Sequence, residues 1–504
     1  MSLSTSEADQ QATIAFLRGL EPCTQITTHA SHVFLYGERV LKLKRALRYE
    51  YLDFSTPEKR IADCERELAI NRQFTANLYL GLHRLTRTPD GALQLDGAGE
   101  AVDGVVEMRR FKDEDLFSRV VEEGRATPAL VTRLARVIAA SHEKAQVATE
   151  GGAESFSRVL ALNEAALRAS APVDTDRIEA LCAKLRALLI RHAALLDARR
   201  ARGCVRRCHG DLTLRNICLF EGEPALFDAL EFDEGLATID VLYDLAFPLM
   251  DLWRLGAHDL ANLLFNRYLD ARDETDGLPL LPLFMATRAV VRAHVTGLLA
   301  KEAPERIPEA QGYFALAEAL LEPRQPLLVA LGGFSGSGKS TLSAQLASAL
   351  GPAPGARILA TDRIRKALHG VAPTDRLPAE AYAPRVSARV YAMEREACAA
   401  TLRAGHGCIA EAVFDRAEDR AAIEAVAKAA GAPFVGFWLE APVEVLAQRI
   451  AGRRDDASDA DEAVMRAQVA RGNEDARWTR LDAAQKVEVL VGEVLCRTEP
   501  IATK

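Results

Sequence analysis

The residues best suited to chemistry form a glycine-rich run that ends in lysine and serine. Residues 333–340 read G-F-S-G-S-G-K-S and complete the phosphate-loop pattern G-x-x-x-x-G-K-[ST]. In such a loop the backbone N–H groups surround phosphate oxygens, the lysine reaches the β- and γ-phosphates, and the hydroxyl holds Mg²⁺. The residues expected to bind nucleotide are Gly333, Ser335, Gly336, Ser337, Gly338, Lys339, Ser340 and Thr341. The run predicts a site for a nucleoside triphosphate, and its Lys-Ser ending argues against a mere tight connection.

The flanking sequence supplies the elements that such a loop needs. Residues 327–331 are an uninterrupted apolar run, typical of a buried strand, and residues 341–350 are compatible with a helix. Further apolar runs precede Asp362, include Glu411 and cover residues 434–439. Strands and helices therefore alternate after residue 326, which predicts an α/β domain with a parallel sheet.

A second polar group lies far upstream of the phosphate loop. Residues 208–216 read C-H-G-D-L-T-L-R-N, so that Asp211 and Asn216 stand at the spacing of a kinase catalytic loop. Asp211 would accept the proton of an attacking hydroxyl, while Asn216 and Asp228, which ends the run L-F-D, would bind Mg²⁺. The alternative is a simple turn with a capping Asp, which the recurrence of three polar positions at working spacing disfavours.

These residues carry a resemblance to a known family. H-G-D-L-x-x-x-N, then F-D-x-x-E-F, then Asp240 and D-L-A at residues 244–246, resembles the aminoglycoside phosphotransferase branch of the protein-kinase-like fold, over residues 28–299. The resemblance implies a phosphate-positioning lysine in a β-hairpin at residues 33–44. Lys42 is preferred and Lys44, on the same strand face, is the alternative.

The resemblance also implies the partners of that lysine and the adenine contact. The helical partner would be Glu67 or Glu65, and Glu107 with Met108 would contact adenine. The chain departs from many family members by Thr213 in place of His and Arg215 in place of Gly, and its hairpin is poor in glycine. These departures affect the acceptor preference and the covering of the phosphates.

Asp362 and Arg365 follow the second apolar run of the phosphate-loop half. In small-molecule P-loop kinases that this region resembles, such as gluconate, shikimate and zeta-toxin-type enzymes, an acid at this position binds or deprotonates the acceptor hydroxyl, with an arginine nearby. The alternative interpretation is that Thr361 or Asp362 caps a helix over residues 363–368. The two interpretations are compatible.

Glu411 ends a buried run where related kinases have Asp in the pattern V-x-x-D-A-T-F. Glu411 could hold Mg²⁺ through water or act as a base. Farther on, Arg449, Arg453 and Arg454 precede the acidic stretch D-D-A-S-D at residues 455–459. These arginines resemble a lid that neutralises charge during phosphoryl transfer, and the alternative is a solvated run of charges.

The bulk properties exclude several classes. The net charge of −8 and the interspersed acids and bases give no basic stripe for a nucleic acid. The first twelve residues have no apolar core, so they are not a signal peptide, and no apolar run approaches the length of a membrane span. Nine dispersed cysteines indicate reduced thiols and a cytoplasmic protein, and C-x₃-C-H at residues 204–209, even with Cys218, is not a zinc pattern.

The sequence thus predicts a two-domain phosphotransferase that uses ATP and Mg²⁺. Residues 1–322 form the aminoglycoside phosphotransferase-like α+β domain, residues 323–326 a linker, and residues 327–504 a P-loop, AAA-type ATP-binding domain that resembles small-molecule kinases. The whole chain resembles bacterial fusions of these two modules. The acceptor is expected to be a small molecule, without nucleic acid or membrane as partner. The alternatives are that one half is a nucleotide-sensing regulator, or that the chain is a toxin-like kinase for a nucleotide sugar or macromolecule.

Overall fold

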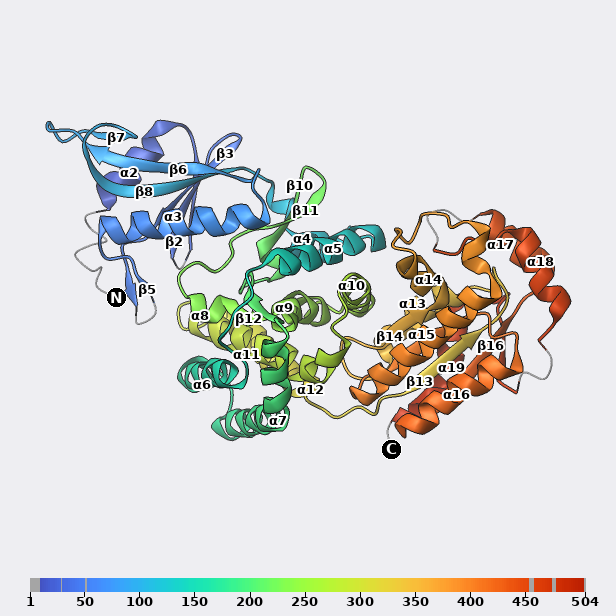
Figure 1. Ribbon diagram of the computed structural model, residues 1–504. Helices are drawn as coiled ribbons and strands as arrows, with labels where there is room; N and C mark the ends of the chain where they lie inside the picture. The colour runs from blue at the N-terminus through green and yellow to red at the C-terminus, as the bar shows by residue number, and fades with distance from the viewer. Residues whose placement is uncertain (1–9, 29, 50–51, 453–456, 474–476, 503–504) are drawn as a thin grey trace. The chain divides into compact units, whose positions relative to one another are not determined.

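The computed structural model describes residues 10–28, 30–49, 52–452, 457–473 and 477–502 (Figure 1). The chain packs as two compact units, Met1–Leu162 with Leu189–Leu255, and Asn163–Leu188 with Gly256–Lys504. The cuts fall inside the helices α6 (Ala153–Ser170) and α7 (Thr175–Ala201). Residues 256–322 therefore pack with the P-loop half, and the boundary at residue 322 stays a prediction about sequence modules.

The first unit begins with a six-stranded antiparallel sheet in the order β1-β2-β3-β8-β6-β7. Its strands are β1 (Thr24–Thr27), β2 (Ser31–Leu35), β3 (Arg39–Lys44), β6 (Tyr79–Arg87), β7 (Leu93–Leu95) and β8 (Glu100–Arg109). A short hairpin pairs β4 (Arg48–Tyr49) with β5 (Leu52–Asp53). The predicted hairpin at residues 33–44 is confirmed by the pairing of β2 with β3.

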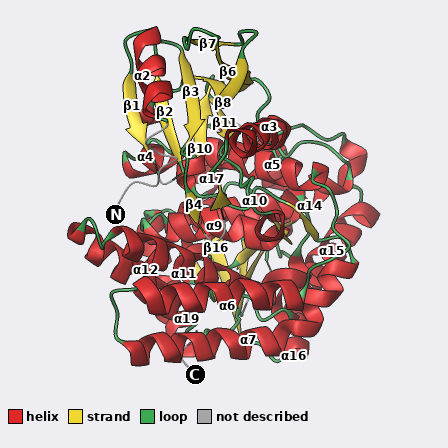
Figure 2. Ribbon diagram, turned by 90° about the vertical axis from the view of Figure 1, so that its left-hand side faces the viewer, coloured by secondary structure: helices red, strands yellow, loops and turns green. Residues whose placement is uncertain are grey.

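Two helices cover the faces of this sheet. Because side chains alternate along a strand, Leu41 and Leu43 of β3 pack with α2 (Gln11–Leu20), whereas Val40 packs with α3 (Pro57–Phe74). Figure 2 shows α2 beside β1, β2 and β3. Helix α3 begins after Thr56, whose side chain accepts a hydrogen bond from the Lys59 N–H, as is typical of an N-cap followed by proline. Lys42 and Lys44 lie on the α3 face of β3.

The rest of the first unit holds the predicted catalytic loop. Two antiparallel pairs flank this loop, β9 with β12 and β10 with β11. Their bounds are β9 (Val205–Arg207), β10 (Ile217–Phe220), β11 (Glu223–Leu226) and β12 (Thr238–Asp240). The helices are α4 (Phe117–Glu122), α5 (Pro128–Lys144), α8 (Glu234–Ala237) and α9 (Val241–Arg254). Helix α9 is buried from Val241 to Leu252, so it is a core element rather than a surface helix.

The second unit contains a five-stranded parallel sheet in the order β14-β15-β13-β16-β17. The strands are β13 (Leu328–Gly332), β14 (Arg357–Ala360), β15 (Cys408–Glu411), β16 (Phe434–Glu440) and β17 (Thr479–Asp482). Their apolar side chains fill two cores, one on each face of the sheet. The predicted parallel α/β sheet is confirmed, and this order brings the carboxyl ends of β13, β14 and β15 together.

Helices cover both faces of the parallel sheet, as such sheets require. They are α13 (Lys339–Leu346), α14 (Thr361–Leu368), α15 (Pro384–Arg403), α16 (Ala417–Ala430), α17 (Val443–Ala451), α18 (Glu462–Arg471) and α19 (Val487–Ala502). α10 (His258–Ala271), α11 (Leu281–Leu299) and α12 (Ile307–Leu320) belong to the same unit. Helix α10 contacts α13 and the turn that follows it.

One segment among the described residues, Thr275–Leu299, is long and apolar enough by composition to cross a membrane. The sequence predicted no apolar run of that length. Of its most apolar window 67% is buried against the rest of the protein, and the core helix of a folded domain passes the same test. One such helix is weak evidence for a membrane span.

Candidate functional site

The phosphate loop joins β13 to α13, and its glycines are required by its shape. Gly338 is the N-cap of α13 with φ of 91°, and Gly336 has φ of 88°. Both values lie in the left-handed region that glycine adopts without strain. A Cβ on Gly336 would lie 2.7 Å from the Leu446 carbonyl oxygen, so any side chain would also clash with α17. The loop N–H groups thus precede a helix N-terminus, the arrangement that binds phosphate.

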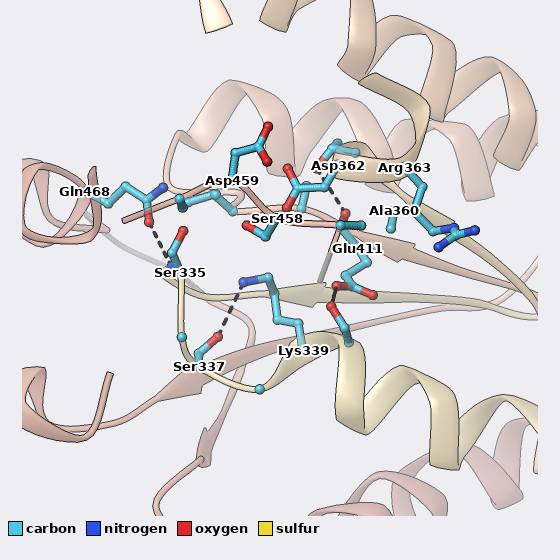
Figure 3. A pocket seen from close by; sticks show the side chains of 18 of the residues that line it. Ser335, Ser337, Lys339, Ala360, Asp362, Arg363, Glu411, Ser458, Asp459 and Gln468 are labelled. Carbon is cyan, nitrogen blue, oxygen red and sulfur yellow. Dashed lines mark hydrogen bonds between the residues drawn. The ribbon is translucent and has the colours of Figure 1, made fainter. Parts of the chain in front are cut away.

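The side chain of Lys339 lies along the inside of this loop. Its Nζ donates hydrogen bonds to the carbonyl oxygens of Gly333, at 2.8 Å, and Phe334, at 3.2 Å. It also donates to the Ser337 hydroxyl, at 3.4 Å (Figure 3). On the other side of the loop, the Ser335 N–H donates to Oε1 of Gln468 from α18, at 2.8 Å. The loop is therefore held in shape by its own lysine and by a glutamine that the sequence analysis did not single out.

Glu411 lies beside the phosphate loop because β15 pairs with β13, with Leu331 opposite Glu411. Its carboxylate accepts hydrogen bonds from the hydroxyls of Ser340 and Ser343, the latter at 2.9 Å. Burial raises the pKa of Glu411, while the two serines and Lys339 act in the opposite direction without cancelling the shift. A carboxylate and a hydroxyl beside a phosphate loop form the oxygen donor set that Mg²⁺ takes.

Asp362 and Arg365 lie in α14, directly after β14. The helix begins at Thr361, its N-cap position is Ala360, and no side chain caps it, so the capping interpretation of Thr361 and Asp362 is wrong. The Thr361 hydroxyl donates instead to the Glu411 carbonyl oxygen, at 3.3 Å. The Arg365 guanidinium lies over the ring of Tyr382, 4.7 Å from its centre, and donates to the Ala381 carbonyl.

These groups line one cavity of about 1440 Å³ in the second unit. The P-loop, Asp362, Arg365, Glu411 and Arg449 all face it. Two other walls come from the start of α15 and from the segment between β17 and α19. The structure therefore brings the predicted residues of the P-loop half to a single space, large enough for a nucleotide and a second molecule.

The predicted lid is only partly described. Arg449 donates to the carbonyl oxygens of Ser337, at 3.4 Å, and Ala483, at 2.7 Å, so this arginine contacts the phosphate loop. Arg453 and Arg454 lie outside the described residues. The last acid of the stretch, Asp459, accepts hydrogen bonds at one oxygen from Lys366, at 2.6 Å, from the Tyr382 hydroxyl and from a backbone N–H. Asp459 is thus a half-buried anchor, and the interpretation as a solvated charge does not hold for this residue.

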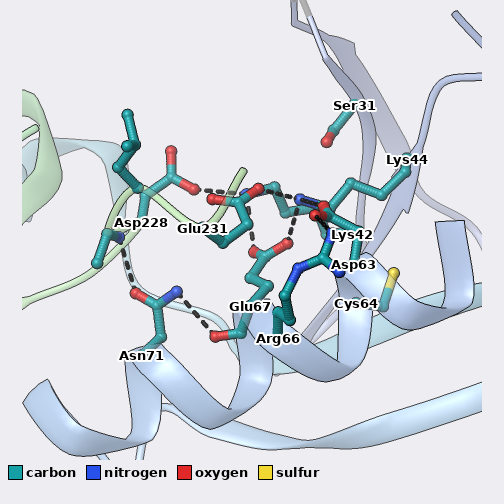
Figure 4. Close-up of polar contacts among 12 residues, drawn as sticks. Ser31, Lys42, Lys44, Asp63, Cys64, Arg66, Glu67, Asn71, Asp228 and Glu231 are labelled. Atoms are coloured by element: carbon teal, nitrogen blue, oxygen red, sulfur yellow. Dashed lines mark hydrogen bonds and ion pairs between the residues drawn. The ribbon is translucent and has the colours of Figure 1, made fainter. Parts of the chain in front are cut away.

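In the first unit, Lys42 joins the predicted helix acid and the predicted metal ligand. Its Nζ lies 2.9 Å from Glu67 Oε1 and 2.5 Å from Asp228 Oδ1 (Figure 4). Burial alone would lower the pKa of Lys42, but Asp228 and Glu67 outweigh burial and raise it. Glu65 is paired with Arg84 at the surface instead. Glu67 is therefore the helix residue that reaches the lysine.

Lys44 belongs to a second, deeper network next to Lys42. Its side chain is 1% exposed and its Nζ contacts Glu67 Oε2, at 2.6 Å, Asp63 Oδ2, at 3.0 Å, and Glu231. Both Asp63 and Glu67 are fully buried. Glu67 thus contacts both lysines, but Lys42 is the one that meets Asp228, which supports Lys42 over Lys44 as the phosphate-positioning residue.

The predicted catalytic loop is fixed mainly by Asp244 of α9. Its carboxylate accepts hydrogen bonds from the backbone N–H groups of His209, at 3.2 Å, and Gly210, at 2.9 Å. Gly210 has φ of 85°, and a Cβ there would lie 3.1 Å from side chains on two sides. The Asn216 amide then donates to both the backbone and the carboxylate of Asp211, each at 2.8 Å. Asp211 and Asn216 therefore form one local group.

Asp228 follows β11 with φ of 59°, a left-handed conformation that is rare outside glycine. Its backbone N–H donates to the Tyr79 hydroxyl at 3.0 Å, and the next N–H donates to the Asn71 side chain. The Phe227 N–H donates to the Asn216 carbonyl. These bonds hold Asp228 between α3 and the catalytic loop, with 45% of its side chain exposed.

Glu107 and Met108 occupy the middle of the sheet. Both lie in β8, paired with β3 on one side and β6 on the other. Met108 packs on the α3 face, whereas the Glu107 carboxylate contacts His83 and Arg39. By the alternation of the strand, Glu107 points away from the Lys42 face. An adenine contact at these residues stays a prediction.

Among the described residues, one group outside these two clusters has metal-ligand atoms close together, namely His142, Cys208 and Asp244. Asp244 already accepts hydrogen bonds from His209 and Gly210 and lies 3.1 Å from His142 Nε2. The Cys208 thiol donates to a backbone carbonyl. This group supports the catalytic loop.

Comparison with known proteins shows which family the chain belongs to. An AAA domain family matches residues 328–474, which include the phosphate loop, Glu411 and Gln468. An uncharacterized protein of Mycobacterium tuberculosis H37Rv is 31% identical over 477 residues, which cover 92% of this chain and 93% of the relative. A Mycobacterium bovis protein matches to the same extent. The chain belongs to the family of these mycobacterial proteins. The relationship spans both units and so includes both clusters.

Solved structures resemble the two halves separately. A gluconokinase from Sinorhizobium meliloti covers 36% of this chain and 95% of its own, at 21% identity and a TM-score of 0.26. A choline/ethanolamine kinase family protein from Mesorhizobium loti covers 62% and 93%, at 17% identity and a TM-score of 0.40. Aminoglycoside 2'-phosphotransferase-IIIa covers 63% and 99%, at 13% identity and a TM-score of 0.36. At these values, residue roles must be argued from the geometry of this family member itself.

Proposed function

We propose that the chain is an ATP- and Mg²⁺-dependent phosphotransferase that acts on a hydroxyl of a small molecule. The observation that carries this proposal is that Lys339, the Ser340–Glu411 pair and Asp362 line one cavity. A phosphate loop without an acid opposite it would support nucleotide binding alone. Asp362 adds a group that can take a proton, and the cavity leaves room for an acceptor.

The proposed reaction assigns a task to each of these residues. The N–H groups of residues 335–340 and the Lys339 ammonium would bind the β- and γ-phosphates, and Arg449 would approach from α17. Ser340 and Glu411 would hold Mg²⁺, which neutralises charge on the phosphate oxygens. The acceptor oxygen forms a bond to the γ-phosphorus as the bond to ADP breaks, and the hydroxyl proton passes to Asp362. Arg365 orients the acceptor side, next to Tyr382.

We infer a second phosphate-handling centre in the first unit. Support comes from the direct contact of Lys42 with Asp228 and Glu67, and from the bonding of Asn216 to Asp211. Lys42 would position the triphosphate, Asn216 and Asp228 would hold Mg²⁺, and Asp211 would accept the acceptor proton. Two carboxylates and an amide give oxygen donors around that position, which fits the metal.

The test is a screen of a metabolite pool with γ-labelled ATP. Wild type should transfer label to a small molecule, and Lys339→Ala and Asp211→Ala should each remove the products of one half. ATP consumption that survives Lys339→Ala unchanged, with any acceptor, would make the P-loop half a regulator. Toxicity on expression that Lys339→Ala abolishes would favour the alternative of a toxin-like kinase.

We also infer a cytoplasmic protein without nucleic acid or membrane as a partner. Support comes from the nine cysteines, all of them free thiols, and from the net charge of −8 without a basic stripe. In an oxidising compartment, Cys496 would be the thiol most open to oxidation, because it is exposed.

A further inference from the structure

An ion cluster at the end of α10 borders the P-loop cavity. The Asp270 carboxylate contacts guanidinium groups from three elements, namely Arg267 of α10 at 2.8 Å, Arg357 of β14 at 2.7 Å and Arg363 of α14 at 2.7 Å. The Asp270 side chain is 21% exposed and those of Arg267 and Arg363 are each 20% exposed. The cluster thus lies at the edge of the cavity rather than in the core.

Helix α10 is held in place by the backbone of β14, the outer strand of the sheet. The Asn266 side chain accepts from the Ile358 N–H at 2.7 Å and donates to the Ala356 carbonyl at 3.2 Å. One turn earlier, Asn262 donates to the carbonyl oxygens of Pro354 and Ala356. Because these amides bond as a neighbouring strand would, Arg267 and Asp270 are fixed relative to the start of α14.

The cluster carries more positive than negative charge. One carboxylate faces three guanidinium groups, which leaves the cluster with two positive charges in excess. Burial lowers the pKa of Arg267, and the neighbouring Arg363 lowers it further, which reflects crowding of like charges. Each guanidinium has five N–H donors, so hydrogen-bonding capacity remains after the contacts with Asp270.

Arg267 and Arg363 both line the cavity, and so does Arg376. Among the described residues Arg376 has no ion-pair partner. Two of the acids that line the cavity are paired with other cations, Asp459 with Lys366 and Asp415 with Arg471. Figure 3 shows Arg363 at the opposite end of the pocket from Gln468, with Lys339, Glu411 and Asp362 between them. The phosphate loop therefore lies on one side of Asp362, the candidate base, and Arg363 lies on the other.

We propose that Arg267 and Arg363 bind an oxyanion of the acceptor, so that the molecule phosphorylated by the P-loop half already bears a phosphate, sulfate or carboxylate group. This inference rests on the proposed phosphotransfer at Lys339 and Asp362, and it names the chemical class of that acceptor. Paired guanidinium groups suit a doubly charged oxyanion because they offer several charge-assisted hydrogen bonds in fixed directions.

A consequence is that the P-loop segment does not contain its whole acceptor site. Arg267 and Asp270 belong to α10, about 60 residues before the matched AAA domain segment at residues 328–474. The upstream part of the chain thus supplies one of the two acceptor-binding arginines and the carboxylate that orients both.

The experiment uses the full-length protein, saturated with a non-hydrolysable ATP analogue and Mg²⁺ so that the phosphate loop is occupied. Inorganic phosphate is then titrated and its affinity measured by calorimetry. Arg267→Gln and Arg363→Gln are each expected to weaken phosphate binding at least about tenfold, since each removes charge-assisted hydrogen bonds. Arg267→Lys should recover part of the loss, because it restores the charge without the planar fork.

Arg403→Gln is the matched control, since this exposed arginine at the end of α15 does not line the cavity. Sulfate should bind like phosphate, and singly charged acetate more weakly. Equal phosphate affinity in wild type and Arg267→Gln would overturn the proposal, as would an equal loss in Arg403→Gln. The affinity for the ATP analogue, measured on the same samples, reports the proposed function separately and also shows that each variant is folded.

Discussion

At the scale of single residues, the raised pKa of Glu411 leads to a prediction about how nucleotide binding depends on pH. A buried carboxyl with a raised pKa is protonated at higher pH than a free glutamate, and its burial is the main cause. The Mg²⁺ site that we propose at Glu411 requires the ionised carboxylate, so metal binding there would release a proton. The stability that protonation of Glu411 contributes to the metal-free protein is present at low pH and is lost as pH rises through the raised pKa.

We therefore predict that the affinity for Mg²⁺–nucleotide rises with pH up to the raised pKa of Glu411, by up to about tenfold per pH unit. Calorimetry in buffers of different ionisation enthalpy measures both the affinity and the protons released. Glu411→Gln should bind more weakly and without this proton release. A pH slope that persists in Glu411→Gln would assign the proton to another group.

The two neighbouring lysines of β3 lead to a second prediction, because they differ in what they contact. Lys44→Ala removes the one cation that Asp63, Glu67 and Glu231 share, so that Glu67 keeps only Lys42 and Asp63 only Arg66 as ion-pair partners among the described residues. Because Asp63 and Glu67 are buried, the loss should lower the free energy of unfolding by about 3–5 kcal/mol. Lys59→Ala, which breaks an exposed pair with Asp53, is the control and should cost at most about 1 kcal/mol. Denaturant unfolding monitored by circular dichroism measures both.

Lys42→Ala should instead act on nucleotide binding by the first unit, because Lys42 is the lysine that contacts Asp228. If Lys42→Ala leaves nucleotide binding by the first unit intact and Lys44→Ala abolishes it in folded protein, then Lys44 and not Lys42 positions the phosphates.

At the scale of elements, the phosphate loop depends on how closely α17 packs against it. Gly336→Ala adds a Cβ 2.7 Å from a backbone carbonyl of α17, in addition to left-handed strain. Gly431→Ala provides the matched control, since Gly431 has φ of 66° and nothing lies within 4 Å of its added Cβ. Gly431→Ala should cost about 1 kcal/mol of stability through strain alone.

Gly336→Ala should cost more stability than this control and should weaken nucleotide binding, because the loop must shift away from α17. Fluorescence titration with a labelled nucleotide measures the binding, and thermal unfolding measures the stability. Equal effects of the two variants would mean that the contact with α17 does not define the loop.

At the scale of the whole molecule, the sequence predicted the elements better than it predicted the completed site. The phosphate loop, the hairpin with Lys42 and the parallel sheet were all legible, because each follows from a local pattern of apolar residues and glycines. The helical partner of Lys42 could not be chosen between Glu65 and Glu67 from the sequence. The structure decides for Glu67, because Glu65 pairs with Arg84. The helix cap expected at Thr361 or Asp362 was wrong because the helix already begins at Thr361, one residue before a Thr361 cap and two before an Asp362 cap would allow.

Several residues of the site had no local signal at all. Three residues that line the P-loop cavity are on average about 100 residues from Lys339 in the sequence, namely Gln468, Asp459 and Arg267. Tertiary packing alone brings them to the cavity. Ser343 is one helical turn from Ser340, so helical spacing could have indicated its contact with Glu411. The sequence thus offered no sign of residues that reach the site through long-range packing, whereas helical spacing could have indicated Ser343.

The position of β14 leads to a prediction for a shortened chain that begins at residue 323. Such a chain would keep the sheet and the phosphate loop but would lose α10, and with it the side chains that bond to Ala356 and Ile358. We expect it to be less stable than the full chain and to form larger particles, as measured by light scattering across a concentration series. A monodisperse and equally stable fragment would contradict this.

The reason concerns self-association. An outer strand with unsatisfied N–H and C=O groups is a template on which another chain can add a strand, and folded proteins protect such edges. Here the protection comes from Asn262, Asn266 and Asp270 of helix α10, not from a further strand. On this prediction, residues 256–322 protect the edge of the parallel sheet from self-association, so the part of the chain that the P-loop fold needs begins upstream of the phosphate-loop segment.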